Sequence, residues 1–134
     1  MKGHARNLMT ERVISVEPDM PLADIVRVLV AGQHGGLPVC DEDERVVGFI
    51  AESDVLDAVL RGTPPETKVR ELMSHPVLVV DEFSTTDEVM SMLRDGKVRH
   101  LPVVRAERLV GIITPHDVLK YFVQRILPIP PEDA

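Results

Sequence analysis

The segment with the clearest potential for chemistry is Gly111-Ile112-Ile113-Thr114-Pro115-His116-Asp117, which predicts a strand end, a tight turn and a helix start. Backbone N–H groups and the positive end of the helix dipole at such a turn suit a phosphate group. The Asp117 carboxylate can accept hydrogen bonds from two neighbouring ribose hydroxyls, as acidic residues do in dinucleotide sites. Thr114 and Asp117 also have the spacing of an ordinary helix cap, and both interpretations can hold together.

A second copy of this pattern occurs earlier, as Gly48-Phe49-Ile50-Ala51-Glu52-Ser53-Asp54. It keeps the acidic residue, Asp54, but places Ala51 where the hydroxyl of Thr114 stands in the other copy. Glu52 adds negative charge that would repel a polyphosphate. Ser53 could supply a hydroxyl by capping the helix slightly later. We therefore predict a main site organised by Asp117 and a weaker one organised by Asp54.

Neither catalysis nor metal binding is indicated by the rest of the sequence. The five histidines are spread along the chain without a pair at metal-ligand spacing, so no metal site and no required cofactor are predicted. Walker, Rossmann and Gly-x-Ser-x-Gly motifs are absent, and no nucleophile and base accompany the two aspartates, so we expect no enzymatic activity. The acidic run at 41–44 is interpreted as a solvated hairpin turn.

Composition limits the partners and the compartment. The net charge of -7, with three Phe, one Tyr and no Trp, argues against binding nucleic acid. The apolar runs are far shorter than the roughly 20 residues of a membrane-spanning helix, and the N-terminus lacks the apolar core of a secretion signal. Cys40 is the single cysteine and is expected to be a buried strand thiol. A cytoplasmic protein without membrane contact is predicted.

An internal repeat organises the whole chain. At an offset of 64 residues, Leu37-Pro38-Val39 matches Leu101-Pro102-Val103, and the Leu-Met-Thr segment ending at Thr10 matches the Leu-Met-Ser segment ending at Ser74. After the acidic turn the offset becomes 63, which places Asp54 on Asp117. The slip falls in a loop, where a deletion is tolerated. The connection between the copies is predicted at 62–66, which is rich in Gly and Pro.

Each copy shows the same order of hydrophobic periods, which predicts strand, helix, two strands and helix. The first helices are expected to begin at Pro21 and at the capping box of Thr85 and Glu88, and to end in left-handed caps at Gly32 and Gly96. The strands are expected at 13–16, 37–40, 46–50, 77–80, 101–104 and 109–113, and the second helices at 53–60 and 116–126.

Both copies have a Leu-Met-Thr or Leu-Met-Ser segment, a Leu-Pro-Val strand, a Val-Gly-hydrophobic strand and an Asp-Val-Leu helix. This order resembles the cystathionine-beta-synthase (CBS) domain pair of stand-alone prokaryotic proteins. The resemblance implies an α+β fold in which two β-α-β-β-α repeats pack about a pseudo-two-fold axis. The repeats are predicted at 5–62 and 68–127, and 128–134 is predicted to be a flexible tail.

The resemblance also implies that each cleft between the repeats binds an adenosine-containing ligand, namely AMP, ADP, ATP or S-adenosylmethionine. Lys97, Arg99 and His100 precede a strand where related proteins carry phosphate-contacting basic residues, although a solvated basic turn is the alternative. For the main site the implied residues are Thr10, Val13, Ile14, Gly35, Gly36, Arg99, His100, Pro102, Ile112, Thr114, His116 and Asp117. For the weaker site they are Pro38, Phe49, Ser53, Asp54, Ser74 and Val77.

The function implied by the resemblance is that of a regulatory sensor, in which ligand binding is read by an unidentified regulated protein. The alternative is a ligand-independent dimerisation or scaffold module, and cation or other small-molecule sensing is a third possibility. A homodimer is expected through apolar helix positions, which could equally be intramolecular core. These positions are Val55, Leu56, Val59, Val118, Phe122 and Ile126.

Overall fold

The computed structural model describes residues 3–32, 34–95, 98–125 and 127, and they form an α+β fold. The chain divides into two compact units. The central unit contains residues 14–77 and 106–109, and the terminal unit contains 1–13, 78–105 and 110–134.

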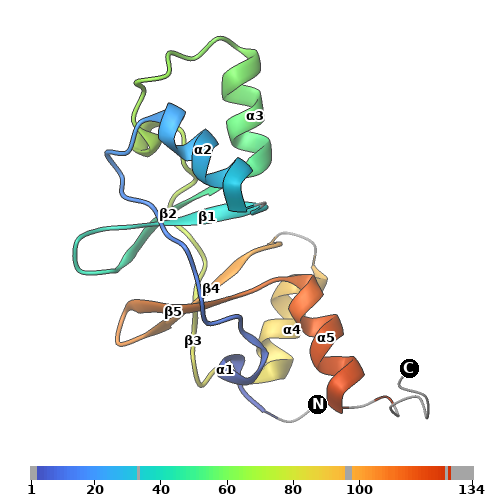
Figure 1. The fold of residues 1–134 in the computed structure, drawn as a ribbon. Helices are drawn as coiled ribbons and strands as arrows, with labels where there is room; N and C mark the ends of the chain where they lie inside the picture. The colour runs from blue at the N-terminus through green and yellow to red at the C-terminus, as the bar shows by residue number, and fades with distance from the viewer. Residues whose placement is uncertain (1–2, 33, 96–97, 126, 128–134) are drawn as a thin grey trace. The chain divides into compact units, whose positions relative to one another are not determined.

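The central unit is built on a two-stranded antiparallel sheet, β1 (Gly36–Cys40) with β2 (Val46–Ala51) (Figure 1). Helix α2 (Leu22–Gly32) precedes the sheet, and helix α3 (Glu52–Leu60) follows it directly. A short 3-10 helix, η1 (Val69–Glu71), comes later in the chain. Strand β2 ends at Ala51 and helix α3 begins at the next residue, Glu52. Asp54 therefore lies in the first turn of α3.

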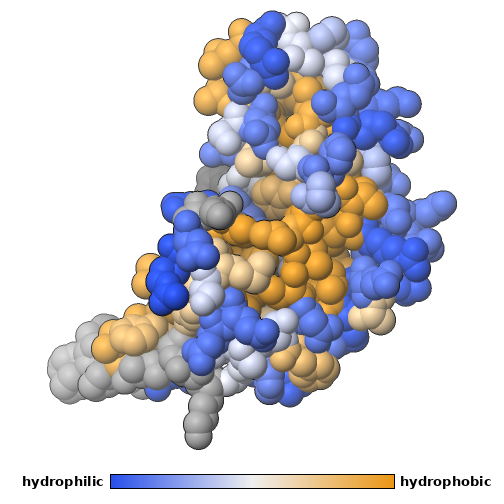
Figure 2. All heavy atoms as spheres, turned by 180° about the vertical axis from the view of Figure 1, so that it is seen from behind, coloured by the Kyte–Doolittle hydropathy of each residue, from blue (hydrophilic) through white to orange (hydrophobic). Residues whose placement is uncertain are grey.

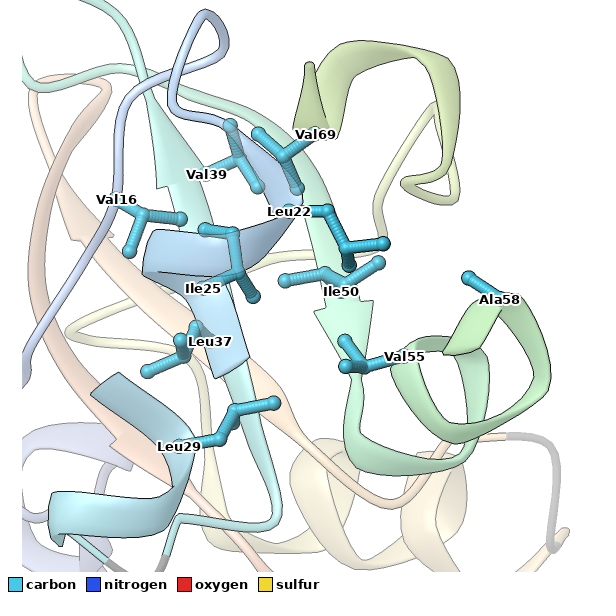
Figure 3. Packing of buried hydrophobic residues seen from close by; sticks show 10 residues of the cluster. All are labelled: Val16, Leu22, Ile25, Leu29, Leu37, Val39, Ile50, Val55, Ala58 and Val69. Atoms are coloured by element: carbon cyan, nitrogen blue, oxygen red, sulfur yellow. The ribbon is translucent and has the colours of Figure 1, made fainter. Parts of the chain in front are cut away.

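The core of the central unit forms where α2 and α3 pack against the sheet (Figure 3). Leu22, Ile25 and Leu29 are buried along one stripe of α2, as expected for an amphipathic helix. Every residue of β1 is buried, so this strand is the centre of the unit. The sheet side contributes Leu37, Val39 and Ile50, and α3 contributes Val55 and Ala58.

The terminal unit contains a three-stranded sheet in the order β3 (Val80–Asp81), β4 (Leu101–Arg105), β5 (Arg108–Ile113). Strand β3 runs parallel to β4. Its helices are α1 (Ala5–Leu8), α4 (Thr86–Arg94) and α5 (Pro115–Arg125). The buried core of the unit contains Ala5, Leu8, Val80, Val89, Leu101, Val103 and Ile113, and the partly buried Val118 and Tyr121 of α5 pack against it.

Most of the elements predicted from the sequence are confirmed. The capping box of Thr85 and Glu88 is present: Thr85 Oγ1 accepts the Glu88 N–H at 3.2 Å, and Glu88 Oε1 accepts the Thr85 N–H at 2.8 Å. The second helices begin one residue earlier than predicted, at Glu52 and Pro115. Ser53 and His116, where these helices were predicted to begin, therefore lie in the first turns of α3 and α5.

Two expectations about local structure are wrong. No strand forms at 13–16, where Val16 makes only an isolated parallel bridge to Val39, and the predicted strand at 77–80 is reduced to Val80–Asp81. Gly32 is the last helical residue of α2 and lacks the positive φ expected of a left-handed cap. The expected cap at Gly96 and the expected tail at 128–134 lie outside the described residues.

The start of the chain packs within the terminal unit and not with the residues that follow it. The Ala5 N–H donates to the Ser84 carbonyl at 2.7 Å, and the Arg6 N–H donates to the Glu82 carbonyl at 2.9 Å. The equivalent segment of the second repeat, around Ser74, packs within the central unit. Each compact unit therefore combines most of one repeat with the leading segment of the other.

Candidate ligand site

Asp117 is the third residue of α5 and is buried, with 6% of its surface exposed. Its Oδ2 accepts the backbone N–H of Thr114 at 2.8 Å and the hydroxyl of Thr114 at 3.1 Å. Strand β5 ends at Ile113, so the turn that holds these bonds joins the strand directly to the helix. The helix-capping interpretation of Thr114 and Asp117 is therefore confirmed, and it leaves part of the carboxylate for other donors.

The other carboxylate oxygen of Asp117 accepts a hydrogen bond from a residue near the beginning of the chain. Thr10 Oγ1 donates to Asp117 Oδ1 at 2.7 Å. Two backbone hydrogen bonds hold Thr10 there: its N–H donates to the Ile112 carbonyl at 2.8 Å, and its carbonyl accepts the Ile112 N–H at 3.0 Å. The terminal unit thus brings together four of the residues predicted for the main site: Thr10, Ile112, Thr114 and Asp117.

The remaining residues predicted for the main site fall in both units. Val13, Arg99, His100, Pro102 and His116 belong to the terminal unit, where Pro102 is buried on β4 and Arg99 and His116 are exposed. Burial, and to a smaller extent the nearby Arg99 charge, lowers the pKa of His100. His100 therefore carries less positive charge near pH 7 than an ordinary histidine does.

Ile14, Gly35 and Gly36 belong to the central unit, and their assignment to the main site stays a prediction. A Cβ atom on Gly36 would lie 2.6 Å from the ring of Phe49, so this glycine accommodates an aromatic side chain of its own unit. Lys97, also considered at the sequence level, lies outside the described residues.

The central unit repeats the same local arrangement around Asp54. The Asp54 Oδ2 accepts the backbone N–H of Ala51 at 3.1 Å, which matches the bond between Asp117 and Thr114. Ser74 pairs with Phe49 through two backbone hydrogen bonds of 3.0 Å and 2.8 Å, as Thr10 pairs with Ile112. Of the other residues predicted for the weaker site, Pro38 is buried on β1 and Val77 is half-buried.

Two differences separate the Asp54 arrangement from the Asp117 arrangement. Ala51 offers no hydroxyl, and Ser53 cannot replace it as a cap because α3 already begins at Glu52. Within the part of the chain that the structure describes, no hydrogen bond joins the Ser74 hydroxyl to Asp54. Asp54 is also only partly buried, so its carboxylate is less occupied and more accessible than that of Asp117.

Sequence reasoning did not identify the role of two methionines at these sites. A Cβ on Gly111 would lie 2.4 Å from the sulfur of Met9, and a Cβ on Gly48 would lie 2.2 Å from the sulfur of Met73. Each methionine therefore fills the space above a strand glycine and places the following Thr10 or Ser74 beside the strand. The Leu-Met pair shared by both repeats was the available signal.

Acidic side chains gather elsewhere in the central unit. Asp41 Oδ1 accepts the backbone N–H groups of Asp43 at 2.9 Å and Arg45 at 3.0 Å, and so shapes the turn between β1 and β2. Residues 42–44 are exposed, as predicted for a solvated turn. Among the described residues, no group of three or more His, Cys, Asp or Glu side chains is arranged to hold a metal ion.

Two α+β repeats that each carry an aspartate at the start of their final helix define the class of this protein. The family model for the CBS domain matches residues 5–61 and 69–124, and the chain belongs to this family. The family and fold expected from the sequence are therefore confirmed.

Similar proteins cover most of the chain. The solved structure of CBSX2 in complex with AMP is 29% identical, with a TM-score of 0.80, over 90% of this chain and 96% of that one. The structure of Hypoxic Response Protein I with two coordinated zinc ions is 29% identical, with a TM-score of 0.78, over 94% of this chain and 100% of that one. Inosine-5'-monophosphate dehydrogenase of Methanocaldococcus jannaschii is 32% identical over 87% of this chain but only 23% of its own length.

The lengths of the relatives limit what they imply. This chain spans 33% and 23% of two of the curated relatives it matches. The similarity to the dehydrogenase thus concerns a minor part of that enzyme. Across the described residues, the helices are too short or too polar to span a membrane.

Proposed function

We propose that this protein is a regulatory module that binds an adenosine-containing ligand, with Asp117 and Asp54 accepting hydrogen bonds from ribose hydroxyls. The main support is the placement of each aspartate at a strand-to-helix turn, where backbone N–H groups favour a neighbouring phosphate. The AMP complex of CBSX2, which shares 29% of its sequence with this chain, supports the class of ligand. The proposed ligands are AMP, ADP, ATP and S-adenosylmethionine.

The proposal assigns the other contacts by position. Thr114 and His116 would complete the Asp117 site together with Arg99 and His100, which precede β4, and Thr10 lies beside the Asp117 carboxylate. Ser53 and Ser74 would complete the Asp54 site. The protein itself would catalyse no reaction, would act in the cytoplasm, and would pass the binding signal to a regulated partner protein.

Isothermal titration calorimetry with AMP, ADP, ATP, NADH and S-adenosylmethionine tests the proposal. Saturable binding is expected for at least one adenosine compound. Asp117→Asn and Asp54→Asn should each weaken or remove one binding event, because the amide lacks the negative charge and second acceptor that a ribose diol requires. Asparagine can still accept the helix-start N–H, so both variants should fold.

Asp57→Asn is the matched control because Asp57 is an exposed residue of α3 whose carboxylate pairs with Arg61 on the same helix. This control should bind like the parent. If none of the five compounds binds a folded parent protein, the adenosine-sensor function is wrong.

The second candidate function is a ligand-independent dimerisation or scaffold module. Exposed apolar side chains favour it, and Figure 2 shows apolar surface among the hydrophilic residues. Leu56 and Val59 are exposed on α3, and Phe122 is 38% exposed on α5. Val55 is buried and Val118 packs against a core, so these two positions are intramolecular, while Ile126 lies outside the described residues. We propose a homodimer under either function.

A further inference from the structure

We propose that the Thr10 hydroxyl is an intramolecular competitor for the Asp117 carboxylate, so that a ligand must displace it in order to bind there. This inference rests on the proposed function, because the competing group is a ligand hydroxyl. It concerns the regulation of the Asp117 site and leaves the Asp54 site without an equivalent competitor.

The Asp117 carboxylate can accept only a limited number of hydrogen bonds. An ionised carboxylate has about four acceptor positions. In Asp117 three are used: Oδ1 accepts the Thr10 hydroxyl, and Oδ2 accepts both the N–H and the hydroxyl of Thr114. The two hydroxyls of a ribose need two positions, so at least one of these intramolecular bonds must be given up.

Thr10 is the group that competes most directly with a ligand for Asp117. Its bond of 2.7 Å is the shortest of the three and, among the described residues, the only one that Oδ1 accepts, so losing it frees a whole oxygen. The Thr114 N–H forms part of the helix start and is fixed by the backbone. Asp117 is only 6% exposed, so little of its surface is open to a ligand while the Thr10 hydroxyl stays bonded to it.

Ser74 is the residue that matches Thr10 in the other repeat. Ser74 has the same backbone pairing with Phe49 that Thr10 has with Ile112. Nevertheless, among the described residues the Ser74 hydroxyl makes no hydrogen bond to Asp54, whose Oδ2 accepts only the Ala51 N–H. The two repeats therefore differ in the group that faces the carboxylate, although their backbones are alike.

The consequence is a difference in how readily the two sites accept a ligand. Binding at Asp54 requires no hydroxyl to leave. Binding at Asp117 requires Thr10 to rotate away, which loosens the contact between the leading segment of the chain and β5. Ligand binding at this site is thereby coupled to the leading segment of the first repeat, because a state that holds the Thr10 bond and a state that holds ligand exclude each other.

The experiment isolates the Asp117 site with Asp54→Asn and measures AMP binding to the full chain by calorimetry. Adding Thr10→Val, which removes the hydroxyl but keeps the shape, should tighten AMP binding by about 5- to 10-fold, the value of one released hydrogen bond. Thr10→Ser keeps a hydroxyl and should match the Asp54→Asn background. In the opposite background, Asp117→Asn, the change Ser74→Ala should not tighten AMP binding at the Asp54 site, because no hydroxyl bond to Asp54 is released there.

Each other outcome has a defined meaning. If the Asp54→Asn protein binds AMP and Thr10→Val leaves its affinity unchanged or weaker, this inference is wrong while the proposed function stands. If AMP binds only through Asp54, Asp117 is no ligand site and the inference is equally wrong. If AMP does not bind the parent at all, both the inference and AMP sensing fail. Thr10→Ala, with its melting curve compared to that of Thr10→Val, separates loss of the hydroxyl from loss of packing.

Discussion

At the scale of single residues, the two aspartates show what sequence patterns can and cannot predict. The spacing of Thr114 and Asp117 predicted a helix start, since the cap depends on residues three positions apart. The bond from Thr10 to Asp117 joins residues 107 positions apart. No local pattern contains such a contact, and only the backbone pairing of Thr10 with Ile112 brings the two side chains together.

A substitution at Gly111 tests the contact between this strand glycine and the Met9 side chain. In Gly111→Ala the new Cβ would lie 2.4 Å from the Met9 sulfur and 2.8 Å from its Cγ, so the methionine must move. Overpacking of this kind is expected to lower the free energy of unfolding by about 1–3 kcal/mol. Urea denaturation of the full chain measures this change.

The control for this prediction is the same substitution in a Met9→Ala background, where the space is open. There Gly111→Ala should cost much less, because the two changes share one contact and are not additive. Equal costs in both backgrounds would show that the methionine contact is unimportant.

At the scale of secondary-structure elements, helices were easier to predict than edge strands. Helices α2 and α4 follow from their apolar spacing and from a start signal within a few residues. The strand expected at 13–16 also had an apolar run, but only Val16 pairs, with Val39. Strand formation requires a partner from elsewhere in the fold, so hydrophobicity alone overestimated this element.

An ion pair joins Glu82, which directly follows β3, to Arg105 at the end of β4. The Arg105 Nε donates to Glu82 Oε2 at 2.7 Å, and its Nη2 donates to Oε1 at 2.9 Å. Hydrogen bonding from Arg105 is the largest cause that holds the pKa of Glu82 below its usual value, and the same bond raises the pKa of Arg105. The pair therefore stabilises the folded terminal unit while Glu82 is ionised.

The sign of this pH dependence follows from the lowered pKa. The contribution of Glu82 is fully present above the ordinary glutamate pKa of about 4.3, and is lost as the pH falls through the lower pKa of the folded state. Glu82→Gln should thus destabilise the protein at pH 7, and the difference from the parent should shrink as the pH falls toward 3. Urea denaturation at several pH values measures it, with the exposed Glu66→Gln as the control. A difference that stays constant with pH would contradict the assignment.

At the scale of the whole molecule, the compact units do not coincide with the sequence repeats. The terminal unit contains both the start and the end of the chain, and the central unit contains the residues between them. Residues 5–13 belong to the first repeat by sequence but supply α1 and Thr10 to the core and site of the terminal unit. Neither unit is therefore complete within a single repeat.

At the scale of the whole molecule we predict that the protein is a homodimer with apolar residues of α5 at its interface. Leu119, Phe122 and Val123 are exposed on α5 at a spacing of three and four residues, which places them on one face. Leu119 also lines a groove of about 440 Å³ between α4 and α5, together with Met90, Leu93, Arg94, Pro115 and Val118. Light scattering should give twice the 14.9 kDa of one chain for the parent.

Leu119→Lys places a charge in this apolar surface and should shift the mass toward the monomer, because the ammonium group would lose its hydration on association. Gln124→Lys adds the same charge at an exposed position of the same helix and should remain dimeric. A monomeric parent would rule out the dimer, and a dimeric Leu119→Lys protein would place the contact elsewhere.

The sequence by itself determined the two repeats, the helix starts and the α+β class, because periodicity and capping act over a few residues and are visible in the chain. It also identified Asp54 and Asp117 as a matched pair. Only the tertiary structure decided that Thr10 occupies the Asp117 carboxylate while Ser74 makes no bond to Asp54. The reason is physical: those contacts depend on which leading segment packs beside which strand, and this pairing joins parts of the chain that no local pattern connects.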